Sequence, residues 1–583
     1  MTNQNIRCRS TFKRFMSLLL VFVMLLSLAA CTANPAGPGT TVGTPSTGTK
    51  PTTTAPTTNP TTPTTVPTPT EPSVPPTTEP EDPAKYELVY TLTQEHVDEF
   101  YRLLDECEQL SIVGEDIDAI EASMEALDEA YLFLEEQHSI AMIFHYSHMS
   151  DKELEQRYLD TVDIATEAND AYLQMARRVY LSDTPAKDVL FEGWTDEDIA
   201  SLLAYDEAIA EIQKRNAEIG VEYRATKDDA RKIELYIEMV KNNNAIARYY
   251  DYDSYYTYAY EKVYNRDYGM DELAQMRQFA KTYLVNDFYT SLNNFYAYFG
   301  NLDASVQQRV QDFLFNSYDE QRADYVGMYI DGAPESLQKA LREMLEHDSL
   351  FTKAVDAREG AFTTMIGERS YCYFGPGYWS STTVMHEGGH YYASLYSDLG
   401  NIPLDLAEVH SQANEWLFIS FLKDKMAYSV QRSAVDYRLY ENIAMTLICL
   451  MVDEFEQEVY STDLTGFTAA DFDAIMDRIA KSYFPDGNVK DYLADMNYYW
   501  RQVVVDQPVY YISYAVSGIA AVGVFTEAEK DYDHAMTIYQ KLCEEPVLDE
   551  GFLANLVSAG LPGPFDEDFY KQLHEILEER KNR

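Results

Sequence analysis

The stretch SSTTVMHEGGHYYASLYSD, residues 380–398, decides how the rest of this sequence is interpreted. We expect it to form a helix that ends at Leu399-Gly400, because glycine is typical just after a helix C-terminus. On such a helix His386 and His390 lie one turn apart on the same face, so both imidazoles can reach one metal ion. Glu387 then lies beside the metal but off the ligand axis, where it can accept a proton from a bound water.

The same five letters can arise without a metal. With ten histidines in 583 residues, a chance His-Glu-x-x-His is expected roughly once in some tens to a hundred such chains. The alternative is therefore a helix whose histidines only pack in the core. Gly388 and Gly389 bear on this choice, because a glycine inside a helix costs about 1 kcal/mol relative to alanine. We expect another backbone or a substrate to approach closely at this turn.

A catalytic zinc site needs a third nitrogen or oxygen ligand and keeps its fourth position open. The segment DLAEVHSQANE, residues 405–415, is predicted to be the next helix, and it offers Glu408 and His410 as competing ligands. Glu408 lies 22 residues beyond His386, which is far enough for the chain to turn back and pack antiparallel. His410 points to another side of the predicted helix.

Three residues of this second helix share one face. Glu408, Ser411 and Glu415 are spaced at i, i+3 and i+7. If Glu408 binds the metal, Glu415 is expected to hydrogen-bond one of the metal-binding side chains and so orient it, and Ser411 lies between Glu408 and Glu415 on this face.

The stretch PVYYISYAVS, residues 508–517, is a further candidate for chemistry. Tyr511 and Tyr514 fall one helical turn apart, and a phenol can donate a hydrogen bond to the oxyanion that forms when water attacks an amide. The alternative is core packing, since the chain contains 47 tyrosines.

Outside these motifs, long amphipathic segments with few glycines or prolines predict a mainly helical body. The exception is ERSYCYFGPGYW at 368–379, which predicts a short strand or hairpin leading into the histidine helix. Four helix starts are marked by a Ser or Thr with an acid three residues later, namely Ser150, Thr195, Thr226 and Thr468. We divide the body near residue 225 into an N-terminal helical region, 84–225, and a catalytic region, 226–583.

The first 31 residues have the pattern of an export signal. A basic stretch precedes an apolar run from Phe15 to Leu28, which is short for a membrane span of about 20 residues. The run ends in Leu-Ala-Ala-Cys31, which resembles the bacterial lipoprotein signal. We expect cleavage before Cys31, a lipid on Cys31, and a body held at the extracellular face of the bacterial cell membrane. A retained anchor helix is the alternative, and it also places the body outside.

Composition predicts a linker and argues against three features: nucleic-acid binding, a disulfide framework and a thiolate metal site. Residues 32–83 are almost wholly Thr, Pro, Gly, Ser and Ala, which predicts a disordered, extended linker. The formal charge of −51 argues against nucleic acid as a partner. Four body cysteines show no regular spacing, so neither a disulfide framework nor a thiolate metal site is expected: Cys107, Cys372, Cys449 and Cys543.

Three segments together resemble the oligoendopeptidase F and thimet oligopeptidase family of zinc metallopeptidases. They are HEGGH at 386–390, AEVHSQANEWL at 407–417 and YYISYAVS at 510–517. Weaker similarity runs through 245–273, and the resemblance covers about 230–560. It implies a large helical zincin-type body with a deep channel that admits short peptides, a small β element next to the HExxH helix, and one Zn²⁺ per chain.

The resemblance also implies roles for individual residues. Glu408 becomes the third zinc ligand, and Tyr511 and Tyr514 become hydrogen-bond donors to the transition state. One departure is that residues 495–509 lack the histidine that family members usually carry before the tyrosine segment. Candidates to replace it are Tyr498, Tyr499 and Arg501. The interval between the histidines and Glu408 is also short for the family.

The resulting hypothesis is a zinc metalloendopeptidase that hydrolyses internal bonds of short peptides outside the cell, with Glu387 as general base and acid. Two alternatives stay open. Thermostable bacterial zinc carboxypeptidases also show HExGH followed by a glutamate helix. A lipid-anchored lipoprotein that binds peptides without turnover would use the same signal and linker.

Overall fold

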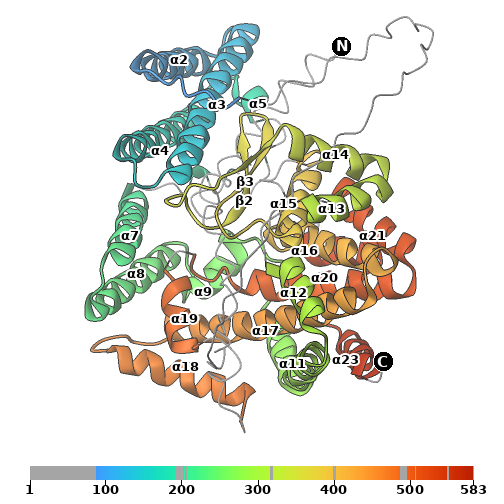
Figure 1. The fold of residues 1–583 in the computed structure, drawn as a ribbon. Coiled ribbons are helices and arrows are strands. Elements are labelled where there is room, and N and C mark those ends of the chain that lie inside the picture. The colour runs from blue at the N-terminus through green and yellow to red at the C-terminus, as the bar shows by residue number, and fades with distance from the viewer. Residues whose placement is uncertain are drawn as a thin grey trace, which may run out of the picture.

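The structure is a computed structural model that describes residues 87–581, apart from 192–193, 195–198, 200–201, 204–206, 316–319, 398–401, 486–494, 506 and 548–550. The export signal, Cys31 and the linker 32–83 lie outside the described residues and stay predictions. The described chain is mainly helical with one three-stranded sheet, which confirms the predicted fold class (Figure 1). Among its helices none is long and apolar enough to cross a membrane.

Three long helices form an arm at the N-terminal side of the body (Figure 1): α2 (Gln94–Val113), α3 (Ile117–Ser147) and α4 (Lys152–Leu181). Asp116 and Asp151 accept backbone N–H bonds from the first turns of α3 and α4. α2 stops at Gly114, whose φ of 68° is the left-handed conformation that closes many helices. The apolar faces of the three helices pack into a core of their own around Phe100 and Tyr172.

The arm leads through α5 (Lys187–Leu190) to α7 (Glu207–Ala225), which packs against α8 (Asp229–Tyr249). Ile219 and Tyr223 of α7 already pack in the main core of the body. The boundary near 225 falls between these two helices and stays a prediction.

The remaining helices surround one large core. They are α9 (Tyr255–Tyr258), η1 (Ala259–Val263), α10 (Met270–Phe279), η2 (Ala280–Leu284), α11 (Val285–Gly300), α12 (Ala304–Phe315), α13 (Glu320–Gly332), α14 (Glu335–Glu346), α15 (Ser381–Ser394), α16 (Leu404–Phe421), η4 (Leu422–Asp424), α17 (Tyr428–Tyr460), α18 (Ala469–Tyr483), α19 (Met496–Val503), α20 (Ile512–Lys530), α21 (Tyr532–Glu544), α22 (Gly551–Ala559) and α23 (Glu567–Lys581). Both η1 and η2 are π-helical.

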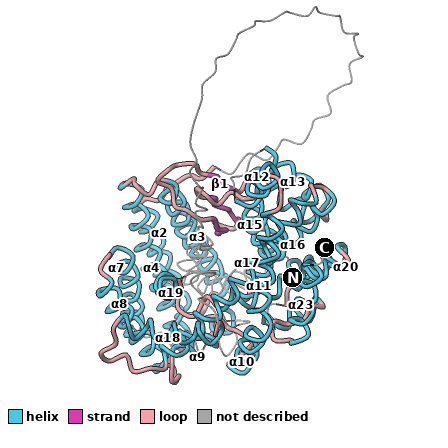
Figure 2. The backbone as a smooth tube through the Cα atoms, turned by 60° about the horizontal axis from the view of Figure 1, so that its bottom comes forward, coloured by secondary structure: helices cyan, strands magenta, loops and turns pink. Residues whose placement is uncertain are grey.

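The centre of the body is built on α16 and α20, which pack along each other, with α15 against α16 and α17 against α20. Both central helices are buried on nearly every face. α20 is apolar or small over most of its length, as expected of a buried helix, whereas α16 buries polar and charged side chains as well. Figure 2 shows α4, α7 and α8 along one side of the molecule and α15 and α16 towards the other.

The sheet lies between the arm and the histidine helix. Its strands β1 (Ser349–Phe351), β2 (Ala361–Ile366) and β3 (Arg369–Phe374) have the order β1-β3-β2, with β3 parallel to β1 and antiparallel to β2. The β2–β3 turn uses Gly367 at a φ of 59°. The predicted strand is therefore β3, and its hairpin partner precedes it in the chain. β2 contacts α3 on one side and α15 on the other.

Two of the predicted helix starts are wrong by one or two residues. Thr468 forms the expected reciprocal cap with Asp471 at the start of α18. α4 and α8 instead begin after Asp151 and Asp228, because these carboxylates accept the first-turn N–H groups in place of Ser150 and Thr226. The predicted start at Thr195 lies outside the described residues. The histidine helix α15 ends at Ser394, earlier than expected, where the N–H of Leu395 bonds three residues back to Tyr392.

Candidate metal and active site

Three predicted side chains converge between α15 and α16. His386 and His390 come from α15 and Glu408 comes from α16, and one possible ligand atom of each lies within 4.8 Å of the others. The Nε2 atom of His386 is 3.9 Å from Oε2 of Glu408. The two imidazole rings are 5.1 Å apart and nearly perpendicular. The structure thus brings the predicted triad together.

These residues fit a zinc ion by both donor chemistry and spacing. Two imidazoles and one carboxylate, with a fourth position open, are a donor set of catalytic zinc. Ligands 2.0–2.1 Å from a tetrahedral zinc lie about 3.4 Å from one another, so the observed separations need only small side-chain adjustments. Oε2 of Glu408 is buried and has no hydrogen-bond partner among the described residues. A bound cation would satisfy this atom.

The competing ligand His410 faces away from this group. Its Nε2 donates to the carbonyl of Leu542 on α21 at 3.0 Å. Burial lowers the pKa of His410 to about 4, so it is a neutral core histidine. Of the two candidates, Glu408 is the one that lies beside His386 and His390, because its side of α16 meets α15.

The close approach expected at the two glycines is found at one of them. A Cβ atom on Gly389 would lie 2.4 Å from the carbonyl oxygen of His410 and 2.7 Å from Cα of Ser411, both in the backbone of α16. A Cβ on Gly388 would instead meet the end of the flexible Leu341 side chain at 2.5 Å. Gly389 is therefore what lets the two ligand-bearing helices approach.

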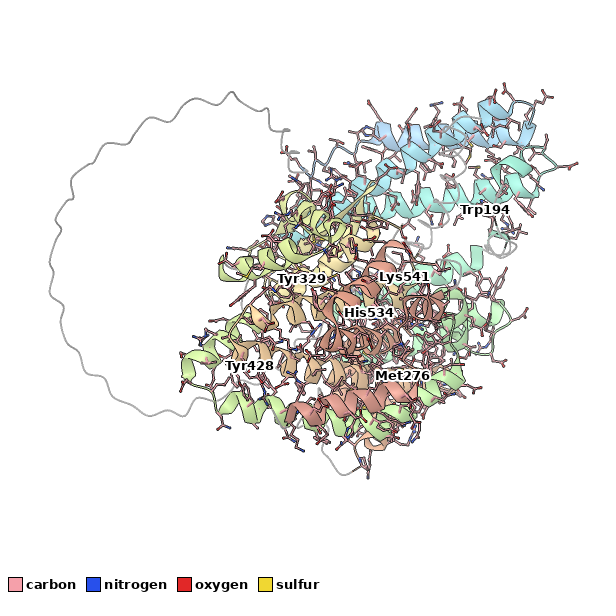
Figure 3. The ribbon with its side chains drawn as sticks, turned by 90° about the vertical axis from the view of Figure 1, so that its right-hand side faces the viewer. Trp194, Met276, Tyr329, Tyr428, His534 and Lys541 are labelled. Atoms are coloured by element: carbon pink, nitrogen blue, oxygen red, sulfur yellow. The ribbon has the colours of Figure 1, made fainter. Side chains whose placement is uncertain are left out.

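A buried amide ties the same two helices together. Asn414 of α16 donates to the carbonyl of Met385 at 2.7 Å, and its Oδ1 accepts a 2.6 Å bond from Tyr329. Tyr329 comes from α13 and is labelled in Figure 3. These bonds fix the register of α16 directly beside His386.

Glu415 stands behind His386, as the i+7 spacing from Glu408 suggested. Its Oε1 is 2.8 Å from Nδ1 of His386, and its other oxygen pairs with the buried Arg438 of α17. Burial opposes a charged imidazole, but the bond to Glu415 and its charge outweigh this and raise the pKa of His386 to about 9. This bond directs Nε2 of His386 towards Glu408. Ser411 donates to the carbonyl of Glu408, not to its carboxylate.

The expected base, Glu387, is buried with only 4% of its surface exposed. Its Oε2 accepts a 2.8 Å hydrogen bond from Thr363 on β2. Burial raises the pKa of Glu387 to about 7, in the range where a carboxylate can both take and return a proton near neutral pH. Burial and the neighbouring His386 hold the pKa of His390 well below its usual value, and burial raises the pKa of Glu408.

Solved structures with this architecture are known. A chain from Bacillus anthracis str. Ames assigned as an oligoendopeptidase F is 15% identical, with 85% of this chain and 97% of that chain covered and a TM-score of 0.62. PZ peptidase A, solved with an inhibitor, is 17% identical over 85% and 98% of the two chains, also with a TM-score of 0.62. A third structure, also assigned as an oligoendopeptidase F, is 18% identical over 85% and 98%, with a TM-score of 0.61.

The chain has the oligoendopeptidase F fold. No protein-family model matches the sequence, and no curated protein matches it. At such low identity the similarity establishes the architecture, and the residues of the site have to be argued from their own geometry.

Within the oligoendopeptidase F fold, the tyrosine segment lies at the start of α20, beside Glu408. Its rings form one cluster, with Tyr514 5.5 Å from Tyr510 and 5.8 Å from Tyr511. The hydroxyl of Tyr510 donates to Oε1 of the candidate ligand Glu408 at 3.3 Å. The sequence does not point to Tyr510, because nothing in the run of tyrosines distinguishes it from Tyr511.

The candidates for the absent histidine differ in their surroundings. Tyr498 is 67% exposed. Arg501 is paired with Asp473 on α18. Tyr499 is buried, and its ring lies edge-on to Tyr511 at 6.2 Å. Of the three, Tyr499 is therefore the one in contact with the tyrosine cluster.

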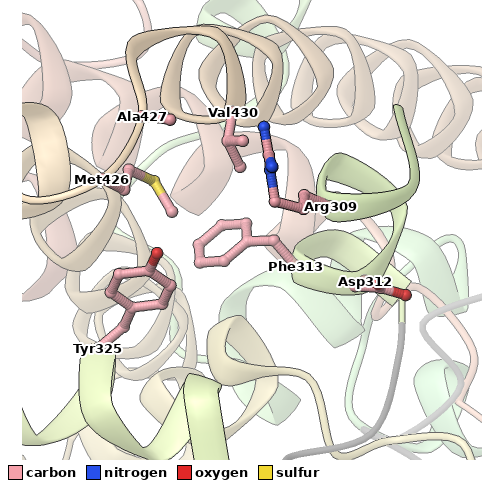
Figure 4. Close-up of a pocket in the computed structure, with 7 residues that line it drawn as sticks. All are labelled: Arg309, Asp312, Phe313, Tyr325, Met426, Ala427 and Val430. Atoms are coloured by element: carbon pink, nitrogen blue, oxygen red, sulfur yellow. The ribbon is translucent and has the colours of Figure 1, made fainter. Parts of the chain in front are cut away.

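A small pocket elsewhere in the body is separate from this site. It lies between α12, α13 and the start of α17, and its lining includes Arg309, Phe313, Tyr325 and Met426 (Figure 4). It shares no lining residue with the candidate metal site.

Proposed function

We propose that this chain is a zinc-dependent metalloendopeptidase that hydrolyses internal bonds of short peptides. The observation that carries the proposal is the carboxylate of Glu387, buried next to three convergent ligands and held by Thr363. A protein that only stores metal or binds peptides needs the ligands but no base beside them. The peptidase names of the structural neighbours support the same reading.

The chemistry that a zinc ion supplies when bound by His386, His390 and Glu408 is polarisation of the scissile carbonyl and a lower pKa for the attacking water. Glu387 accepts the proton of that water on Oε1, because Oε2 is held by Thr363, and returns it to the leaving nitrogen. Tyr511 and Tyr514 donate to the developing oxyanion, a role worth about 3 kcal/mol per donor in comparable sites.

We also propose that the body works outside the cell, attached to the membrane through a lipid on Cys31. The Leu-Ala-Ala-Cys31 boundary and the Thr/Pro-rich linker 32–83 support this location. Short peptides in the surroundings of the cell are then the substrates within reach.

The test uses the full chain, purified in mild detergent, and a library of internally quenched peptides with amidated C-termini. We expect cleavage that a chelator abolishes and that zinc restores. Glu387→Gln should retain zinc and lose turnover, because it removes the proton acceptor and leaves every ligand. Glu346→Gln, an exposed acid at the end of α14, is the matched control and should cleave normally.

The outcomes separate the alternatives. Failure to cleave the amidated library, with release of the last residue from the same peptides carrying a free C-terminus, would indicate a carboxypeptidase. Zinc-loaded protein that binds peptides without cutting them would indicate a binding lipoprotein. Retained activity in Glu387→Gln would overturn the assignment of the base.

A further inference from the structure

The backbone just before α20 is strained at a residue that does not tolerate strain well. Val509 has a φ of 64°, in the left-handed region that β-branched residues almost never adopt. Such a conformation persists only where the surrounding structure imposes it, and it is found most often at functional sites. Val509 immediately precedes Tyr510, whose hydroxyl contacts Glu408.

Three side chains from distant parts of the chain hold this turn, Pro508–Tyr510. Tyr264 donates to the carbonyl of Pro508 at 2.8 Å. Arg266 donates through Nη2 to the carbonyl of Val509 at 3.0 Å, and Glu456 of α17 accepts from the N–H of Val509 at 2.8 Å. Both polar groups of the strained residue are thus bound by the buried side chains of Arg266 and Glu456. We call Tyr264, Arg266 and Glu456 the clamp residues.

Arg266 also connects the turn to the two central helices. The same Nη2 atom lies 3.0 Å from Oγ of Ser513 in the first turn of α20, and Nε is 3.8 Å from Asp405 in the first turn of α16. The guanidinium lies over the rings of Tyr260 and Tyr264, 4.4 Å from each centroid. The segment that carries Arg266 follows the π-helix η1, a geometry frequent at functional sites.

The consequence is found at Glu408. Tyr510 contacts Oε1 of this carboxylate, while Oε2 is the atom that has no hydrogen-bond partner among the described residues and lies 3.9 Å from His386. If the turn relaxed to an ordinary conformation, the peptide planes on both sides of Val509 would rotate and carry the Tyr510 ring away from Glu408.

We propose that the clamp residues hold Val509 in its strained conformation so that the Tyr510 hydroxyl fixes Oε1 of Glu408 and leaves Oε2 for the metal. The clamp residues and Tyr510 are positioning residues, and the inference rests on the proposed metal site. It assigns a role to the segment around Tyr264 and Arg266, which the proposed reaction does not otherwise use.

The first experiment measures the zinc dissociation constant of the full chain by competition with a chelating dye. Tyr510→Phe should weaken zinc binding about tenfold, because groups that orient a metal ligand typically contribute 10–100-fold. Tyr264→Phe keeps the aromatic ring next to Arg266 but removes the hydrogen bond to Pro508. It should weaken zinc binding about threefold, less than Tyr510→Phe, because the other clamp residues still hold the turn. Tyr570→Phe is the control, since its buried hydroxyl on α23 donates to the carbonyl of Pro564 at 2.6 Å, outside the clamp and the turn. It should leave zinc binding unchanged.

The second experiment tests the strain itself on the metal-free protein. Val509→Gly and Val509→Ala remove nearly the same buried side chain, but only glycine is relaxed at a positive φ. We expect the glycine variant to have the higher Tm, the reverse of the usual order. In the Tyr264→Phe background, Val509→Gly should return zinc affinity towards that of the wild type, because glycine adopts the turn without the clamp.

Three results would overturn the inference alone: wild-type zinc affinity in Tyr510→Phe, an alanine variant more stable than the glycine variant, or no rescue in the double variant. A wild-type chain that binds no zinc and cleaves no peptide would instead remove the proposed function, and the inference with it. Peptide cleavage measured on the same samples distinguishes the two failures.

Discussion

The N-terminal arm and the α15–α16–α20 centre are both built from helices packed on helices, yet their contacts differ in kind. The arm packs apolar side chains from three amphipathic helices into a small separate core. The centre packs backbone against backbone at Gly389 and buries carboxylates, imidazoles and guanidinium groups in a connected set of polar contacts. Side-chain packing tolerates change, whereas polar networks and backbone contacts do not. The centre, which holds the candidate metal site, should therefore tolerate substitution less well than the arm.

The largest effect is expected at the contact that makes the centre possible. Gly389→Ala should destabilise the protein by about 3 kcal/mol, because the new Cβ meets the rigid backbone of α16. Gly388→Ala is the matched control and should cost less than about 1 kcal/mol, since Leu341 can rotate away and alanine favours the helix. Urea unfolding of both variants checks this. Equal losses of stability in the two variants would mean that α15 and α16 can move apart without cost at Gly389. The contact between their backbones would then not distinguish the centre from the arm.

The next effect concerns the carboxylate behind His386. Glu415→Gln should lower zinc affinity about 10–100-fold, because an amide orients the imidazole less firmly than a carboxylate does. Glu441→Gln is the control: Glu441 also pairs with Arg438, at 3.1 Å, but it does not contact His386. Isothermal titration of the metal-free variants with zinc measures both. If the control loses as much affinity, the effect comes from the Arg438 charge balance and not from Glu415 itself.

A pH experiment probes the arm. Asp128 of α3 is buried, accepts a bond from Tyr172, and has its pKa raised by burial to about 7. Since the folded pKa lies above the unfolded one, this carboxyl contributes its stability fully below about pH 4 and loses it as the pH rises to about 7. The free energy of unfolding of Asp128→Asn should equal that of the wild type at pH 4 and exceed it by about 1.5 kcal/mol at pH 7.5. This difference is smaller than the full pKa shift implies, because local opening of the arm exposes the ionised Asp128 to water.

Urea unfolding with pulsed hydrogen exchange, which resolves α2 to α4, measures the pH effect. Glu129→Gln, an exposed acid next to Asp128 on the same helix, is the control and should show no such dependence. Zinc affinity and peptide cleavage should be the same in Asp128→Asn as in the wild type. A change in either would contradict the separation of arm and centre.

The smallest effect is expected at Thr363. Thr363→Val removes the hydrogen bond to Glu387 and should lower kcat about fivefold, which corresponds to about 1 kcal/mol. Thr364→Val is the control from the same strand, because the Thr364 hydroxyl is buried without a hydrogen-bond partner among the described residues. It should leave kcat unchanged and stabilise the fold slightly. Steady-state peptide cleavage at matched zinc content gives kcat for both variants. An equal loss of kcat in Thr363→Val and Thr364→Val would show that only the packing of β2 matters.

The sequence by itself determined the mainly helical class and the placement of His386 and His390 on one helix face. Both depend on local periodicity, since helical spacing places residues on one face wherever the helix packs. A close approach of another backbone or a substrate at the two glycines of the motif was also predicted, although the sequence did not show that Gly389 and not Gly388 would make it. The three predicted helix starts that fall among the described residues were placed to within two residues, because several polar side chains near one end compete to cap it.

Only the tertiary structure decided which neighbours these residues meet. His410 faces Leu542 because α21 packs on that side of α16, and Thr363 reaches Glu387 because β2 lies against α15. Arg266 and Val509 are 243 residues apart, and no spacing rule connects them. The physical reason is that a helix defines its own faces from local sequence, whereas the partner of each face depends on how distant segments share one core.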